Sequence, residues 1–167
     1  MILAAFTFFH VVLSLVGIAS GFVAVYGILA SKRVEGWTTT FLITTAATGV
    51  TGFLFPFEGF KPSYVLGILS LIVLAIAIAA RRRVQLVSGW RRTYAAMAVV
   101  ALYFNVFVLI VQMFPKVPAL KALAPTQSEP PFQVTQLAAL IVFAVLGFRA
   151  AMKYQAPKTA PVGSPGA

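Results

Sequence analysis

The chain has 167 residues, of which 60% are hydrophobic and 10% are charged, and its formal net charge is +10. Soluble domains average about 45–50% apolar and roughly 25% charged residues, so this composition excludes an ordinary soluble domain. The sequence contains no cysteine, which excludes disulfides and thiolate chemistry.

Five uncharged apolar segments follow one another along the chain. Each is long enough to cross a hydrocarbon core of about 30 Å, which takes about 20 helical residues. The pattern predicts an all-α transmembrane helical bundle that forms one domain over residues 1–154. Residues 155–167 are rich in Pro, Gly, Ala and Ser, and this composition predicts a disordered cytoplasmic tail. The expected spans cover about residues 3–30, 38–56, 63–82, 90–114 and 131–153.

Basic residues gather in the first and third connections and after the last span. Lys and Arg that flank membrane spans stay in the cytoplasm, so the amino terminus is expected outside and the carboxyl terminus inside. The arginine cluster also suits anionic lipid headgroups, whereas nucleic acid is not expected, because basic flanks serve membrane topology. The expected interfacial anchors are Trp37, Trp90, Arg81, Arg82, Arg83, Arg91 and Arg92.

The first two spans carry small residues at four-residue spacing. Lipid gives no hydrophobic drive for helix pairing, so such faces let helix backbones approach closely. The first span has a GxxxG pair, and the second has a stripe of threonine and glycine. We expect these two spans to pack together, and a homodimer through the GxxxG face is the alternative. The packing candidates are Ser14, Gly17, Gly21, Thr44, Thr48 and Gly52.

Strong polar side chains concentrate in the outer halves of the spans. His10 and Asn105 are each expected about 12 Å below the outer surface. An unpartnered polar group in hydrocarbon costs about 2–7 kcal/mol, so both should point inward and be hydrogen-bonded. They form either a buried network that fixes helix register or an outward-facing pocket for a small ligand, a proton or a headgroup. The pocket candidates are His10, Thr48, Thr51, Asn105, Gln112, Gln136, Glu129 and Gln127.

The fourth connection, residues 114–132, contains five prolines. Its Leu and Val residues predict a short interfacial helix between Pro118 and Ala124. One interpretation is a rigid connector on the membrane surface. The other is a lid that places Gln127 and Glu129 above the outer polar residues.

Four segments resemble a family of small bacterial polytopic integral membrane proteins to which no activity is assigned. The segments are HVVLSLVGIASG, EGWTTTFLITTAATGVTGFLFPF, ALYFNVFVLIVQMF and KVPALKALAPTQSEPPF, and the likeness covers most of residues 10–150. Relatives often carry a histidine where this chain has Tyr64. The resemblance implies a bacterial inner-membrane protein, and it implies no substrate, cofactor or catalytic residue.

The sequence shows no nucleophile elbow, no phosphate-binding glycine loop and no pair of metal-ligating side chains. Three acidic residues leave little acid–base chemistry. We therefore expect a non-catalytic, multi-pass membrane component without metal or cofactor, either an accessory subunit or a small binding protein with an outward-facing pocket. The alternatives are an oligomeric transporter or channel for small solutes or protons, and a haem- or quinone-linked redox protein near His10.

Overall fold

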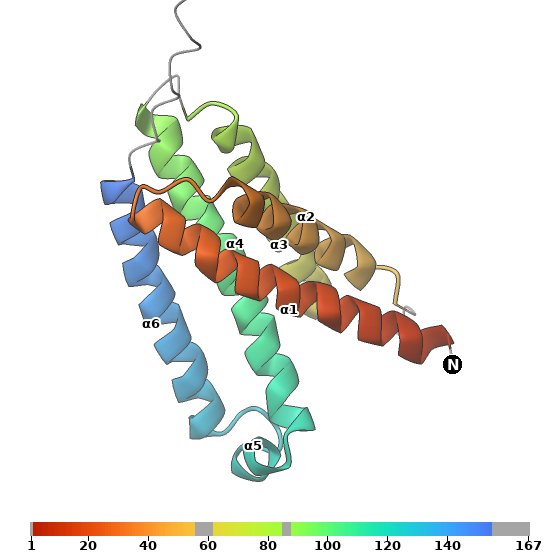
Figure 1. Cartoon of the computed structure of the whole chain (residues 1–167). Coiled ribbons are helices and arrows are strands. Elements are labelled where there is room, and N and C mark those ends of the chain that lie inside the picture. The colour runs from red at the N-terminus through yellow and green to blue at the C-terminus, as the bar shows by residue number, and fades with distance from the viewer. Residues whose placement is uncertain (1, 56–61, 85–87, 155–167) are drawn as a thin grey trace, which may run out of the picture.

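The computed structural model describes residues 2–55, 62–84 and 88–154. Every regular element in these ranges is an α-helix (Figure 1), which confirms the predicted all-α bundle. The predicted tail, residues 155–167, lies outside the described residues. The helices are α1 (Ile2–Leu29), α2 (Glu35–Gly52), α3 (Pro62–Arg81), α4 (Ser88–Lys116), α5 (Pro118–Leu123) and α6 (Pro130–Lys153).

Four helices, α1, α3, α4 and α6, are long and apolar enough to cross a membrane. This is the character expected of a membrane protein. Helix α2 is not among these four, because its 18 residues include Glu35 and seven threonines. It also begins and ends earlier than the expected span of residues 38–56, and a turn over residues 53–54 follows it.

The long helices pack antiparallel to their neighbours in sequence. Along α1 and α2, the most extensive pair, His10 lies beside Thr51 near one end and Gly17 faces Thr44 further along. Helices α3 and α4 pack together, α4 packs on α6, and α1 also contacts α4. The expected pairing of the first two spans is therefore present within one chain.

Gly21 sets the closest approach of three helices. A Cβ atom at this position would lie 2.6 Å from Cδ1 of Leu102 on α4 and 2.9 Å from the ring of Phe41 on α2. Both distances are shorter than real Cβ contacts, so a side chain at this position would displace the side chains of Leu102 and Phe41. Gly17 and Gly21 are both buried, and the GxxxG face is used inside the chain.

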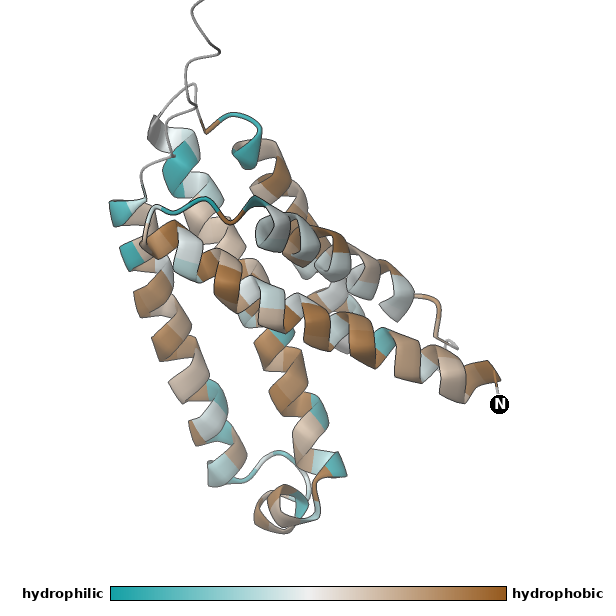
Figure 2. Ribbon diagram, in the orientation of Figure 1, coloured by the Kyte–Doolittle hydropathy of each residue, from teal (hydrophilic) through white to brown (hydrophobic). Residues whose placement is uncertain are grey.

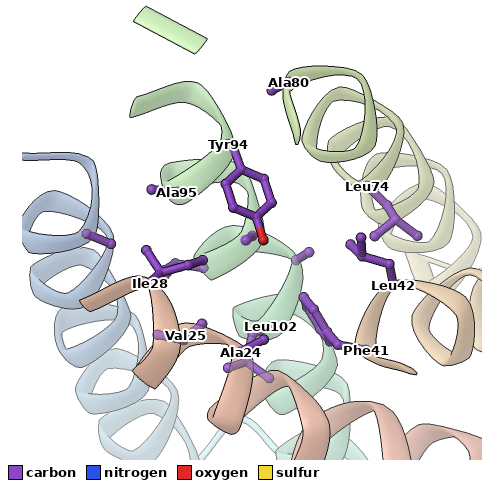
Figure 3. Packing of buried hydrophobic residues seen from close by; sticks show 14 of the residues in the cluster. Ala24, Val25, Ile28, Phe41, Leu42, Leu74, Ala80, Tyr94, Ala95 and Leu102 are labelled. Carbon is purple, nitrogen blue, oxygen red and sulfur yellow. The ribbon is translucent and has the colours of Figure 1, made fainter. Parts of the chain in front are cut away.

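The packed core occupies one half of the bundle. Phe41 and Leu102 are fully buried and Leu74 is 2% exposed (Figure 3). By contrast, the first half of α1 leaves large apolar side chains uncovered, such as Phe8 at 72% exposure. The core thus lies toward the end where α1, α3 and α6 finish and α2 and α4 begin.

We call this end of the bundle the basic end, because basic side chains gather there. The other end of the bundle is called the opposite end. Figure 2 shows hydrophilic residues at these helix ends above apolar helix surfaces. The bundle therefore has a cap of basic side chains over its packed core. The basic residues in this cap are Lys32, Arg33, Arg81, Arg82, Arg83, Arg91, Arg92, Arg149 and Lys153.

Candidate functional site

Asn105 is buried at the edge of the core, with 7% of its surface exposed. Its Nδ2 atom donates a hydrogen bond to Oγ1 of Thr45 on α2, at 3.0 Å. A Cβ added at Gly17 would lie 3.7 Å from the same amide nitrogen. The amide therefore joins α4 to α2 beside the glycine face of α1, as the expectation of an inward, hydrogen-bonded Asn105 requires.

His10 is half-buried nearer the opposite end. Its Nδ1 atom lies 2.8 Å from Oγ1 of Thr51, and the ring of Phe55 packs edge-on against the imidazole at 5.2 Å. The Thr51 hydroxyl also donates to the Ala47 carbonyl at 2.7 Å. The contact between His10 and Thr51 thus joins α1 to α2.

Two further candidates each keep a buried oxygen without a hydrogen-bond partner in the described structure. These atoms are Oγ1 of Thr48 on α2 and Oε1 of Gln136 on α6. The Gln136 Nε2 atom donates to the Phe107 carbonyl of α4 at 3.3 Å. The side chain thus ties α6 to α4, away from the bonds that His10 and Asn105 make with α2.

The connection between α5 and α6 holds its own polar residues. Gln127 Nε2 donates to the Val111 carbonyl of α4 at 2.6 Å, and Gln112 is exposed. Glu129 accepts hydrogen bonds from the Thr126 hydroxyl at 2.8 Å and from the Ser128 amide at 3.0 Å. Desolvation acts to raise the pKa of the Glu129 carboxyl, but these bonds outweigh it and the pKa is lowered.

The short helix expected between Pro118 and Ala124 is present as α5, and it packs against α4. Figure 1 shows α5 at the ends of α4 and α6, well away from the amino-terminal end of α1. Gln127 and Glu129 bond within this region instead of covering His10. The structure therefore places the eight pocket candidates in separate local groups. The connection joins α4 to α6 and does not cover His10.

A cavity of about 270 Å³ opens at the basic end instead. Its walls come from the end of α1, the start of α2, the end of α3, the start of α4 and the residue after α6. Three basic side chains and one carboxylate line it, so the lining carries an excess of positive charge. The polar lining residues are Lys32, Arg33, Glu35, Thr38, Arg81, Tyr94 and Tyr154.

Aromatic and hydroxyl groups form the floor of this cavity. Tyr94 is 4% exposed, and its ring is directed from α4 into the middle of the core (Figure 3). Its hydroxyl is hydrogen-bonded to Thr38 on α2, and its ring centroid lies 5.7 Å from that of Tyr154. Burial raises the pKa of the Tyr154 hydroxyl, so it stays protonated and able to donate at neutral pH.

Charged side chains form the rim of the cavity. Arg81 Nη2 lies 2.6 Å from Oε2 of Glu35, and the exposed fractions of the two side chains are 27% and 72%. Lys32 Nζ stands 5.8 Å from the ring centroid of Tyr26. The rim is therefore partly exposed, whereas Tyr94 in the floor is buried.

The expected interfacial anchors have different environments. Trp37 is 53% exposed, whereas Trp90 packs beneath the Arg83 guanidinium at 4.9 Å. Arg91 Nε donates to the Val84 carbonyl at 3.0 Å, which links the first turn of α4 to the residues that follow α3. Arg82 and Arg92 are exposed, and Arg81 belongs to the cavity.

The sequence analysis missed the cavity because its lining residues are of the types that flank membrane spans. In the sequence, Tyr94 resembles an aromatic residue of the membrane interface, and Thr38 does not stand out from the other threonines of α2. The available signal was their position, because both lie about one turn inside the basic cluster on helices that meet there. No group of three or more His, Cys, Asp or Glu side chains that could hold a metal ion occurs among the described residues.

No protein-family model, no curated protein and no solved structure matches the chain.

Proposed function

We propose that this chain is a non-catalytic protein of the bacterial inner membrane that crosses the bilayer five times. In this topology the amino terminus is outside and the basic end is cytoplasmic. Helices α1 and α3 both run toward the basic end, since each is antiparallel to α2. If both of these apolar helices cross the membrane, α2 has to cross back between them.

The threonines of α2 are compatible with a crossing helix. Thr44 donates to the Thr40 carbonyl at 2.7 Å, and Thr51 donates to the Ala47 carbonyl at 2.7 Å. Back-bonding of this kind satisfies the hydroxyl within its own helix. The free-energy cost of placing these threonine hydroxyls in the hydrocarbon layer is therefore much smaller than the composition of α2 suggests.

We propose that the protein acts as a binding protein or accessory subunit whose ligand is a small anionic solute held in the basic-end cavity. The single observation that carries this proposal is the lining, in which three cations face one carboxylate above a floor of hydroxyl groups. Cationic groups beside low-dielectric walls concentrate anions. The Tyr154 and Thr38 hydroxyls supply neutral hydrogen bonds to a bound oxyanion.

The polar residues between the core and the opposite end favour a structural role. Asn105 and His10 each have a threonine partner, and such bonds fix the register of α1, α2 and α4. Burial of Gly17 and Gly21 removes the exposed face that a GxxxG homodimer would need, which disfavours an oligomeric pore built on that face.

Single cysteines test the cavity directly, because the chain has none of its own. We would place one at Thr38 in the cavity and one at the exposed Ser128 in the distant connection. Each purified variant is reacted with an anionic and a cationic methanethiosulfonate reagent. The ratio of the two rates at position 38 should exceed that at position 128 by about tenfold or more, because the cavity potential attracts anions.

Inorganic phosphate, the probe for binding, should slow labelling at position 38 and leave position 128 unchanged. Lys32→Gln should lower the rate ratio, whereas Arg149→Gln, which removes an exposed cation outside the cavity, should not. Val34→Cys gives a second reporter in the lining if Thr38→Cys folds poorly. Equal rate ratios at the two ends, or no protection by phosphate, would refute anion binding in the cavity.

A further inference from the structure

A groove of about 520 Å³ runs between α2 and α3 on the outer surface of the bundle. The two helices are in close contact where a Cβ at Gly49, near the carboxyl end of α2, would lie 2.7 Å from Cδ2 of Leu71 in the middle of α3. The groove lies on the basic-end side of this contact, and its lining runs from Ala46 to Arg82. The groove therefore begins in the apolar zone and ends among the basic residues.

The groove has an apolar floor. It is formed by Leu42, Ile43 and Ala46 of α2 and by Ile78 of α3. Ile43 is 63% exposed, whereas Leu42 is 6% exposed and belongs to the packed core, so the floor reaches from the core out to the bundle surface. Residues 39 to 46 rise about 10 Å along α2, which gives a channel that runs along this helix on the outside of the bundle.

The basic-end mouth of the groove is cationic. Arg81 and Arg82 line it, and the Arg82 side chain is exposed. Glu35 is the nearby carboxylate, and Arg81 holds it at 2.6 Å. Arg82 does not line the cavity described above, so the two sites can be tested separately.

We propose that this groove binds an anionic phospholipid, with one acyl chain lying along Leu42, Ile43 and Ala46 and the phosphate at Arg82. Charge complementarity selects this occupant. A neutral hydrocarbon chain fits the apolar floor, and an anionic headgroup meets a guanidinium at the depth where the apolar zone ends. A zwitterionic lipid would fill the floor equally well but would gain less from the cationic mouth.

The experiment places the full chain in nanodiscs that contain phosphatidylcholine and phosphatidylglycerol. After gentle extraction, mass spectrometry counts the lipid molecules that stay bound. Phosphatidylglycerol should be retained in preference to phosphatidylcholine. Arg82→Gln should lower its retention roughly fivefold, and Arg92→Gln, which removes another exposed basic-end cation outside the groove, should leave it unchanged. Ala46→Phe, which fills the floor, should lower retention although every charge remains.

Three outcomes would overturn the proposal. The first is equal retention of the two lipids, which would remove the role of the anionic headgroup. The second is an equal loss from Arg92→Gln, which would show a diffuse attraction to the whole basic end. The third is displacement of the lipid by millimolar inorganic phosphate, which would show that the phosphate group alone is bound. Arg82→Gln alters only an exposed side chain, so its result stands even if Ala46→Phe disturbs the fold.

Discussion

The Nη2 atom of Arg81 lies 2.6 Å from the Oε2 atom of Glu35, and this ion pair joins the last turn of α3 to the first turn of α2. A cation at a helix carboxyl end and an anion at a helix amino end both suit the helix dipoles. Because Glu35 is 72% exposed, the pair adds little to stability. Its consequence is geometric, since it fixes the wall shared by the cavity and the groove.

Removing the carboxylate should strengthen anion binding. Glu35→Gln deletes the one acidic side chain that lines the cavity, so phosphate should protect Thr38→Cys at lower concentrations than in the parent. The change in unfolding free energy should stay within about 1 kcal/mol, as for other exposed pairs. Weaker phosphate protection in Glu35→Gln would mean that the ligand is not an anion.

The Asn105–Thr45 bond should be measurable as a coupling energy between α4 and α2. We expect Asn105→Leu, Thr45→Val and the double variant to give a coupling of about 0.5–1.5 kcal/mol, the range for hydrogen bonds between membrane helices. Unfolding by sodium dodecyl sulfate in mixed micelles supplies the three free-energy differences. Strict additivity of the two single changes would rule the bond out as a register device.

Gly21→Ala should destabilise the bundle by about 1–3 kcal/mol through overpacking. The added methyl would meet Leu102 and Phe41 at less than 3.0 Å. The matched control is Gly36→Ala, where a Cβ would have no atom within 4 Å. That variant should be neutral or stabilising by up to about 1 kcal/mol. The same unfolding assay compares them, and equal effects would contradict the three-helix contact.

The Glu129 loop should weaken in acid. The folded-state pKa of Glu129 is lowered, so its stabilising contribution is present above its ordinary value of about 4.3 and is lost as pH falls through the lowered pKa. Hydrogen exchange at the Thr126 and Ser128 amides, corrected for intrinsic rates, measures this. Glu129→Gln should reduce protection at neutral pH and remove its pH dependence. Protection that is the same in parent and variant at every pH would refute the role of the carboxylate.

The sequence predicted the helices well because long apolar segments between cations allow few other structures in lipid. It also predicted the pairing of α1 with α2, since Gly17 and Gly21 leave room for a neighbouring backbone. It did not predict which polar residues meet. Helix tilt and rotation decide that His10 reaches Thr51 and that Asn105 reaches Thr45, and neither quantity is encoded in local spacing.

The cavity was hidden for the same physical reason. Tyr94 and Tyr154 are far apart in sequence, and their rings come together only because α4 and α6 pack antiparallel. The apolar groove depends on how α2 and α3 pack against each other, because its lining comes from both helices. Such features arise from packing between helices and not from the sequence of any single helix.

We propose that α2 crosses the membrane between α1 and α3, with the basic end in the cytoplasm. Single cysteines at Lys32, before α2, and at Glu58, after α2, test it with a membrane-impermeant maleimide. We expect Glu58→Cys to be labelled in intact cells and Lys32→Cys to be labelled only after the inner membrane is opened. Labelling of both positions from the same side would contradict it.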